Sequence, residues 1–467
     1  MRSGYTYDTI AAAERVAPMQ LDAVRLPLVA WWLERRPGPD AVLARLFAYD
    51  GRVPIGAAAG ALGDGVLEAL LGAGIVAARD GAVTAHLRLT PFEGLLLLSD
   101  PLEAGGEAVM GPGPTTAMLA RAMPAAPGSV LDLGCGAGTL ALLAAARGAP
   151  RAVGVDLSAR AIALARVNAR LNASAAEFRE GDLLAPVHGE RFDLAVSQPP
   201  YVPLPAGVAP TVYLHGGARG DELAVRFAAT LPAALTPGGR ALLLFDAPAG
   251  GAALHERLRA ALGDAPADLV VLAGPGPSAD LQAVAYAAME DPGLGMVYGA
   301  AVRRYRDHLA ALGAEAFARA LVVLRSSDRP GGRFTIELPL PGLAGLGPAA
   351  IDRYLAALDL ASGPDAALLA APVKAAAELR VREERPAGPA GGAAPALSVR
   401  FEPGWVGTDR QVSPAGVFLL DALSAAASVE EAAARFAEAV GEAPAVARAK
   451  VLAFVREGLS RGLLAAG

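Results

Sequence analysis

One segment, residues 130–201, constrains the fold more than any other, because it begins with a strand, a glycine turn and a helix in immediate succession. Residues 129–133 are an apolar stretch typical of a buried strand, and residues 139–147 are rich in alanine and leucine, as expected of a helix. Between them stand Gly134, Gly136 and Gly138. Glycine lets the backbone turn sharply and approach a ligand closely. This order predicts an α/β sheet that binds a nucleotide-like ligand at the turn.

The acids that follow favour an adenosine-containing ligand without a pyrophosphate. A dinucleotide fingerprint would place its third glycine at position 139, where the chain has Thr139. Residues 153–156 form a second strand ending in Asp156, which is placed to accept hydrogen bonds from both ribose hydroxyls. A third strand, near residues 176–179, leads to Asp182, whose carboxylate can meet an adenine amino group. Three strand ends are therefore expected to converge on one ligand.

Each acid also has an ordinary structural interpretation. Asp132 and Asp156 could cap helices, and Asp182 could begin a turn. Their order favours binding, because each follows an apolar strand at regular spacing and ligands of open α/β sheets lie at the carboxyl ends of strands. Cys135 is expected only to fill space in the turn.

A second motif follows a fourth predicted strand, residues 192–197. Gln198-Pro199-Pro200-Tyr201 leaves this strand in an extended conformation, which the two prolines enforce. The backbone carbonyls of the motif are therefore expected to be rigid.

With these motifs, residues 105–275 resemble class I S-adenosylmethionine-dependent methyltransferases that carry an Asn/Asp/Ser-Pro-Pro-Tyr/Phe motif. This subgroup includes release-factor glutamine methyltransferases and enzymes that methylate amino groups of adenine and guanine. The resemblance implies a Rossmann-like seven-stranded sheet and S-adenosylmethionine as cofactor, with S-adenosylhomocysteine as product. It also implies that the motif's first side chain and the next carbonyl accept hydrogen bonds from a planar NH2 group, on which the aromatic ring stacks.

These catalytic roles would fall to Gln198, Pro199, Pro200 and Tyr201. An amide or aryl amine nitrogen has a delocalised lone pair, so it must be positioned and polarised before it attacks a sulfonium methyl group, without need of a strong base. Gln198 is one methylene longer than the usual Asn or Asp. The change indicates an acceptor placed farther out, a target other than a carboxamide, or lost catalysis; the intact cofactor motifs argue against the last.

The predicted cofactor-binding residues lie at the strand ends, in the turn and ahead of a helix expected at residues 117–123. They are Asp132, Gly134, Gly136, Gly138, Asp156, Leu157, Asp182, Leu183 and Thr115. A threonine in the place of Thr115 lines the entrance between cofactor and acceptor in similar enzymes, although it could also be an ordinary N-cap. Tyr213 and His215 are substrate-binding candidates in a Gly/Pro-rich segment, residues 202–220, expected to form a lid; a histidine in such a polar loop is more often only solvated.

Composition limits the remaining possibilities. The 467 residues, 54% of them hydrophobic, suggest two to four domains. One cysteine excludes an internal disulfide, five scattered histidines predict no metal site, and the absence of a signal-like or 18-residue apolar run predicts a cytoplasmic protein without a membrane partner. A net charge of -6 makes a nucleic-acid partner less favoured without excluding it. Lysine occurs only at Lys374 and Lys450, a bias that indicates a bacterial genome rich in G and C.

Three domains are expected. Residues 1–100 resemble a winged helix, with helices at 40–49, 55–62 and 65–73 before strands at 75–78 and 83–89. Residues 101–345 form the methyltransferase domain, completed by strands at 240–246, 269–272 and 320–325, with helices inserted at 279–313. Residues 346–467 form an α/β module, winged-helix-like from about 411, after a linker at 385–396. This module distantly resembles peptide-binding modules of peptide-modifying enzymes; a packing or dimerisation domain is the alternative.

The expected function is methyl transfer to a planar or amino nitrogen of a peptide, protein or small metabolite. One alternative acceptor is a nucleobase of RNA or DNA, which would have to leave its stack and lie on Tyr201. Another alternative is a non-catalytic regulator or scaffold that binds S-adenosylmethionine. The sequence does not fix the oligomeric state, with a homodimer among the possibilities.

Overall fold

The computed structural model describes residues 4–16, 22–49, 51–101, 107–384 and 396–467. The chain divides into two compact units. Unit 1 comprises Met1–Ala120, Ala125–Ala253 and Gly276–Ala318, and unit 2 comprises Arg121–Pro124, Leu254–Pro275 and Arg319–Gly467. These limits differ from the three predicted domains, whose boundaries remain a prediction.

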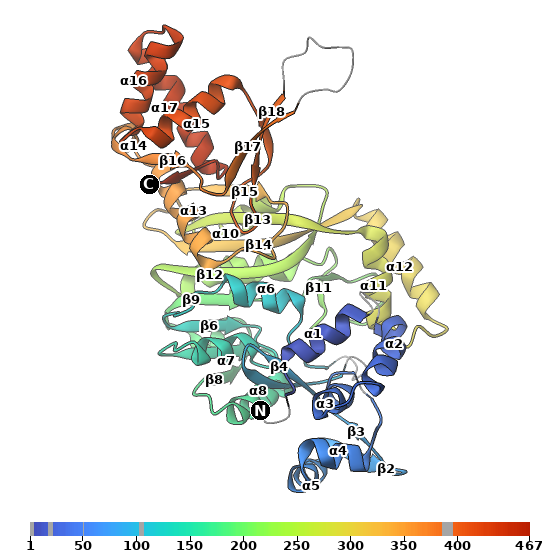
Figure 1. Ribbon diagram of the computed structural model, residues 1–467. Helices are drawn as coiled ribbons and strands as arrows, with labels where there is room; N and C mark the ends of the chain where they lie inside the picture. Colours follow the sequence, from blue (N-terminus) through green and yellow to red (C-terminus); the bar gives the residue numbers. More distant parts are fainter. Residues whose placement is uncertain (1–3, 17–21, 50, 102–106, 385–395) are drawn as a thin grey trace, which may run out of the picture. The chain divides into compact units, whose positions relative to one another are not determined.

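The largest sheet has eight strands in the order β15-β13-β14-β12-β9-β6-β7-β8 (Figure 1). The strands are β6 Val130–Leu133, β7 Ala152–Asp156, β8 Glu177–Glu180, β9 Phe192–Ser197, β12 Leu235–Pro248, β13 Ala267–Ser278, β14 Ala316–Ser326 and β15 Thr335–Pro339. β12, β9, β6, β7 and β8 pair with one another in parallel. Asp132 aligns with Gly154 on one side and Val196 on the other, so the carboxyl ends of β6, β7 and β9 share one edge.

This strand order is that of a class I methyltransferase sheet, so the predicted fold class is confirmed. The three strands predicted beyond the second motif lie within β12, β13 and β14. The sequence analysis missed the eighth strand, β15, which pairs with β13 in parallel at the edge of the sheet. Its sequence, TIELP, does alternate polar and apolar residues, so a short period-2 signal for this strand was present and was overlooked.

Helices α7 Thr139–Ala146 and α8 Ala159–Leu171 pack beside the first strands of this sheet. Residues 139–144 of α7 are all buried, which explains why its sequence is apolar on every face. The hairpin β4 Arg88–Phe92 and β5 Leu95–Ser99 joins α8 through Asn168, whose Oδ1 accepts from the Leu98 N–H at 2.8 Å. Asn168 Nδ2 also donates to the Ala137 carbonyl at 2.9 Å, so this fully buried amide supports the glycine turn.

The amino-terminal region has its own apolar core, which includes Leu46, Phe47, Val53 and Val83. Its elements are α1 Tyr7–Val16, α2 Asp22–Glu34, α3 Pro39–Phe47, β1 Val53–Pro54, α4 Ile55–Leu62, α5 Asp64–Gly72, β2 Val76–Arg79 and β3 Ala82–Ala85. The three predicted helices match α3, α4 and α5, and β1, β3 and β2 form an antiparallel sheet in that order. The predicted strand 83–89 is wrong as one element, because β3 ends at Ala85 and Leu89 pairs with Leu98 in the next hairpin. The winged-helix assignment remains a prediction.

Among the described residues, no single helix has both the length and the apolar character needed to cross a membrane. The pair α4 and α5 meets that test together, by length and composition alone, with a bend of 111° between the two helices.

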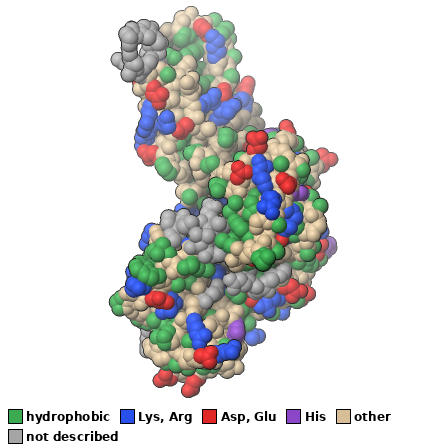
Figure 2. All heavy atoms as spheres, turned by 90° about the vertical axis from the view of Figure 1, so that its right-hand side faces the viewer, with side chains coloured by type: hydrophobic (Ala, Val, Ile, Leu, Met, Phe, Trp, Pro, Cys, Tyr) green, Lys and Arg blue, Asp and Glu red, His purple; other side chains and the backbone are tan. Residues whose placement is uncertain are grey.

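The helices predicted at 279–313 are present as α11 Ala279–Glu290 and α12 Tyr298–Ala311. They pack on each other through an aromatic core in which Tyr286 and Tyr305 have ring centroids 5.6 Å apart. Outside that core, Leu281, Met296 and Val297 are exposed. Hydrophobic side chains are interspersed with charged ones on the face of the molecule drawn in Figure 2.

Unit 2 contains most of the carboxyl-terminal elements and a core that includes Leu420, Val429, Val451 and Leu464. The elements are α13 Pro348–Ala361, α14 Asp365–Ala370, β16 Val373–Ala375, β17 Leu379–Glu384, β18 Ala396–Phe401, β19 Arg410–Val412, α15 Pro414–Ala425, α16 Val429–Val440, α17 Pro444–Ser460 and β20 Leu464–Ala466. The predicted linker at 385–396 lies outside the described residues, except for Ala396, which begins β18.

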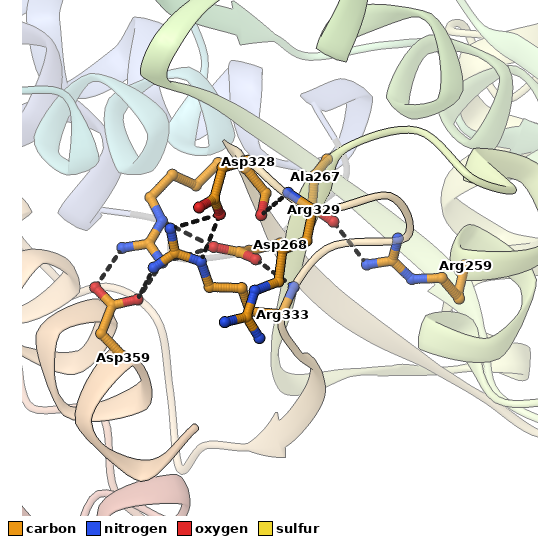
Figure 3. Close-up of polar contacts among 9 residues, drawn as sticks. Arg259, Ala267, Asp268, Asp328, Arg329, Arg333 and Asp359 are labelled. Carbon is orange, nitrogen blue, oxygen red and sulfur yellow. Dashed lines mark hydrogen bonds and ion pairs between the residues drawn. The ribbon is translucent and has the colours of Figure 1, made fainter. Parts of the chain in front are cut away.

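A charge cluster joins α13 to the sheet within unit 2 (Figure 3). Asp268, 1% exposed, accepts from Arg325 Nη2 at 2.6 Å and from the Arg333 backbone N–H at 2.7 Å. Arg325 also donates through Nη1 to Asp359 on α13 at 2.8 Å. Arg333 extends the cluster outward to the exposed Asp328. The buried carboxylate is therefore satisfied by partners from several segments, as a buried charge requires.

Candidate active site

The glycine turn after β6 adopts a backbone that favours glycine. Gly134, Gly136 and Gly138 have φ of 74°, 52° and 84°, all in the left-handed region. A Cβ on Gly138 would lie 2.7 Å from Phe178 Cε1, whereas a Cβ on Gly136 would have only the Met110 carbonyl oxygen nearby, at 4.0 Å. The turn therefore packs tightly at Gly138 and leaves open space at Gly136.

Asp156 ends β7 directly beside this turn. Its Oδ2 accepts from the Gly136 N–H at 2.9 Å, and its Oδ1 accepts from the Ser158 N–H at 2.9 Å. Burial raises the pKa of this carboxyl, while the backbone donors lower it. A carboxylate oxygen accepts more than one hydrogen bond, so Asp156 can hold the turn and still receive ribose hydroxyls. Leu157 follows it and is 61% exposed, which places an apolar surface next to the acid.

Asp132 binds the first turn of a helix, as its alternative interpretation predicted, and its contact with a cofactor remains a prediction. Its carboxylate is 2% exposed, and Oδ2 accepts from the Ala141 N–H at 3.0 Å in the first turn of α7. Burial raises the pKa of Asp132 to about 7. The side chain thus fixes the start of α7 against the end of β6 and supports the turn from inside the fold.

A positively charged side chain that was not predicted, Arg226, lies near the end of β8. Gly181 N–H donates to the Asp156 carbonyl at 2.9 Å, which joins the ends of β8 and β7. Asp182 accepts from Arg226 at 2.9 Å, with both side chains about half exposed. Arg226 lies on α9 Glu222–Thr230. Leu183 next to Asp182 has a left-handed φ of 49°, which is uncommon for leucine and marks a tight turn.

The second motif lies at the same edge of the sheet. Ser197 Oγ donates to the Leu133 carbonyl at 2.7 Å, so the residues before each motif are in direct contact. Gln198 Nε2 donates to Thr115 Oγ1 at 2.7 Å, and Gln198 Oε1 accepts from Thr116 Oγ1 at 2.9 Å. The structure therefore brings together Thr115 and Gln198, which were predicted separately, and adds Thr116, which was not predicted.

The helix that carries these threonines, α6 Pro114–Ala122, begins three residues before the predicted start. Proline is compatible with the first position of a helix, because its missing N–H would have no intrahelical partner there. Thr115 and Thr116 therefore lie in the first turn of α6 instead of ahead of it.

The two prolines lead into a compact loop. β10 Val202–Pro203 pairs in parallel with β11 His215–Gly217, and Val202 N–H donates to the Leu214 carbonyl at 2.9 Å. A Cβ on Gly216 would lie 2.4 Å from the Pro200 carbonyl oxygen, so this glycine permits the close approach of the two segments. Pro199 is buried, and Pro200 and Tyr201 are half-buried.

His215 is not merely solvated. Its Nδ1 accepts from the Thr211 N–H at 2.9 Å, so the neutral ring carries its proton on Nε2, which lies 3.2 Å from the Tyr305 hydroxyl. Burial lowers the pKa of His215. Tyr213 packs against the same apolar cluster as Tyr305 and Val202, and burial raises its pKa. The predicted lid is thus a packed segment joined to the helical insertion, and acceptor contacts by Tyr213 and His215 remain a prediction.

Residues 111–258 match the family described as the methyltransferase small domain, a segment that contains both motifs. The release factor glutamine methyltransferase of Deinococcus radiodurans is 40% identical over 141 residues, which cover 28% of this chain and 50% of the relative. The enzyme of the same name from Geobacter sulfurreducens is 38% identical over 122 residues, 24% of this chain and 43% of the relative. The chain spans about half the length of the curated relatives it matches.

Among solved structures, a ribosomal protein L11 methylase from Lactobacillus delbrueckii is similar, at 26% identity and a TM-score of 0.23 over 34% of this chain and 65% of that chain. The strand order described above, and not this likeness, identifies the fold. Within the part of the chain that the structure describes, no group of three His, Cys, Asp or Glu side chains is arranged to hold a metal ion.

Proposed function

We propose that the protein is an S-adenosylmethionine-dependent N-methyltransferase whose acceptor is a planar nitrogen of a peptide or protein. One observation carries the proposal: the hydrogen bond from Ser197 to Leu133 joins the end of the cofactor strand to the start of the Gln198-Pro-Pro-Tyr motif. Methyl transfer needs the methyl donor and the acceptor nitrogen side by side. This contact supports a cofactor site and an acceptor site at the same edge of the sheet. The names of the relatives, which are glutamine methyltransferases of a protein, support a carboxamide acceptor.

The residues at the strand ends fit the proposed cofactor. The open space at Gly136 admits a ligand beside the turn backbone, Asp156 is placed for the ribose hydroxyls, and the exposed Leu157 offers an apolar face to adenine. Asp182 and Leu183 would hold the amino edge of the adenine, and Arg226 donates to the Asp182 carboxylate from α9. When bound, the cofactor supplies an electrophilic methyl group on a sulfonium ion.

The second motif would hold and polarise the acceptor. Gln198 Oε1 retains one lone pair beyond its bond to Thr116, so it can accept from an acceptor N–H. The Pro199 carbonyl supplies a second acceptor, and Tyr201 supplies an aromatic face for a planar group. Asp132 is buried under α7, which leaves catalysis to positioning and hydrogen-bond acceptance.

A defined panel of acceptors tests this proposal. Peptides that differ only in one central residue, Gln, Asn, Lys or Arg, and a short single-stranded RNA are incubated with methyl-labelled S-adenosylmethionine and wild type or Gln198→Ala. We expect wild type to label the glutamine peptide, with the added mass of one methyl group on its side chain, and Gln198→Ala to label it far less. Label confined to RNA would favour the nucleobase alternative. No label in any acceptor, from a protein that binds the cofactor product, would favour the non-catalytic regulator.

We further propose that residues 1–100 and the part from about 411 are winged-helix-like modules flanking a methyltransferase domain at 101–345. The order α3, β1, α4, α5, β2, β3 supports the first module, and the separate apolar cores near each terminus support independent modules. A cytoplasmic location and a bacterial source remain predictions.

A further inference from the structure

A chain of two hydrogen bonds links the backbone ahead of α6 to the side chain that begins the second motif. The Gly113 N–H donates to Thr116 Oγ1 at 3.2 Å, and Thr116 Oγ1 donates to Gln198 Oε1 at 2.9 Å. The other end of the same carboxamide is also bound, because Gln198 Nε2 donates to Thr115 Oγ1 at 2.7 Å. Two neighbouring hydroxyls therefore bind both ends of one amide.

The donors and acceptors of these bonds determine the orientation of the Gln198 carboxamide. Thr116 Oγ1 already accepts from a backbone N–H, so its single proton is available for Gln198 Oε1. The amide oxygen is thus assigned to the Thr116 side and the amide nitrogen to the Thr115 side, an assignment that the network itself determines. One lone pair of Oε1 and one N–H of Nε2 remain for a ligand.

We propose that Thr115 and Thr116 are positioning residues that hold the Gln198 carboxamide in place for the acceptor. Glutamine has one more rotatable bond than the asparagine usual in this motif, so an unsupported Gln198 would sample several amide positions. The paired threonine bonds remove that freedom and compensate for the longer side chain. This inference rests on the proposed function, because it concerns the same acceptor site.

Substitutions at Thr116 and Gln198 should lower the rate of methyl transfer by different amounts. A misplacement of about 1 Å in such a site can cost about 100-fold in rate, so we expect Thr116→Val to lower kcat by about that factor. Thr116→Ser keeps the hydroxyl and should restore most of the rate. Gln198→Asn, although closer to the related enzymes, should be slower than wild type, because the shorter amide does not reach both threonines. Thr116 is the cleaner test, since Thr115 is also a candidate for cofactor contact.

The bonds from Thr115 and Thr116 to the Gln198 carboxamide form a clamp, which an NMR measurement tests without any acceptor. The chain has only four glutamines, Gln20, Gln198, Gln282 and Gln411, so labelling glutamine side chains with ¹⁵N gives four amide nitrogen signals, each with a pair of protons. The Gln198→Asn spectrum identifies the signal of interest by its loss. We expect that signal in wild type to exchange slowly with water, to become fast-exchanging in Thr116→Val, and to be unchanged in the control Thr230→Val, which removes a hydroxyl from α9.

Fast exchange of the Gln198 amide in wild type would overturn the clamp. A kinetic arm uses the glutamine peptide with wild type, Thr116→Val and Thr116→Ser, and measures kcat, KM and S-adenosylhomocysteine affinity. Equal loss of rate in Thr116→Val and Thr116→Ser would show that the Thr116 hydroxyl is not what the rate depends on, and would overturn the inference. Loss of cofactor affinity in parallel with the rate would show that Thr116 supports the fold of the site, and would overturn it as well. If wild type binds no S-adenosylhomocysteine, the proposed function fails, while the NMR arm still decides the clamp by itself.

Discussion

Gly138 and Gly148 flank α7 and allow the packing of the cofactor turn to be tested separately from its backbone conformation. Both glycines are left-handed, with φ of +84° and +86°. A Cβ at Gly138 would lie 2.7 Å from Phe178 Cε1 and 3.0 Å from Ala165 Cβ, whereas a Cβ at Gly148 would meet nothing within 4 Å. The Phe178 ring is 5% exposed and lies equally close to the Cβ position of Gly154, so it has little room to move away.

The two alanine substitutions should therefore differ in cost. Each places a Cβ in the left-handed region, which costs about 1–2 kcal/mol. Gly138→Ala also overpacks the space beside Phe178, which typically costs about 1–3 kcal/mol more, and alanine is a poor N-cap, which acts in the same direction. In a domain of about 150–250 residues, 1 kcal/mol shifts the melting temperature by about 2–4 °C. We expect Gly138→Ala to melt about 2–12 °C below Gly148→Ala.

Differential scanning calorimetry measures this difference on the transition that S-adenosylhomocysteine shifts upward, which identifies the cofactor-binding domain. Affinity for S-adenosylhomocysteine should fall in Gly138→Ala and stay close to wild type in Gly148→Ala. Equal melting temperatures of the two variants would refute the packing argument, because backbone conformation would then account for the whole cost.

Three other perturbations follow from the electrostatics. Asp132→Asn should flatten the pH dependence of thermal stability. The pKa of wild-type Asp132 rises from 3.8 to about 7 on folding, so the stability of wild type falls as pH rises through that window. Identical profiles of melting temperature against pH for the two proteins would contradict this. Asp268→Ala should lower the unfolding free energy of unit 2 by about 3 kcal/mol in urea titrations, since it breaks a buried ion pair, whereas Asp328→Ala on the exposed side of the cluster should have little effect. Burial lowers the pKa of His215 below 6.5, so the stabilising contribution of the neutral ring is complete above pH 6.5 and is lost as pH falls. Hydrogen exchange of residues 202–217 should therefore accelerate in acid. Exchange that is independent of pH, after correction for the intrinsic exchange rate, would contradict this.

The sequence could predict the elements that carry a local signal. The apolar strands, the three turn glycines and the two prolines are each recognisable within a few residues, and they mark the sheet edge where the site lies. Asp132 shows the limit of that reasoning, because the same acid at the same strand end could bind a ligand or cap α7. Its burial and its bond to Ala141 show the cap, which depends on packing that no local pattern reveals, while its contact with a cofactor stays a prediction.

Contacts between distant segments could not be predicted from the sequence. Thr116 and Gln198 are 82 residues apart, and a threonine after a proline indicates only a helix start. Arg226 pairs with Asp182 across 44 residues, and His215 meets Tyr305 across 90. The short edge strand β15 is a different case, because its residues TIELP alternate polar and apolar and could have been recognised from the sequence.

Calorimetric titration of S-adenosylhomocysteine into wild type, Asp156→Ala and Asp328→Ala tests the central claim most directly. The account predicts binding to wild type and to the Asp328→Ala control, which loses the same carboxylate group from an exposed position in unit 2. Asp156→Ala should bind at least about tenfold more weakly, because a hydrogen bond to a charged group contributes about 1.5–3 kcal/mol. Equal affinity of Asp156→Ala and wild type, or no binding to wild type, would contradict the proposed cofactor site.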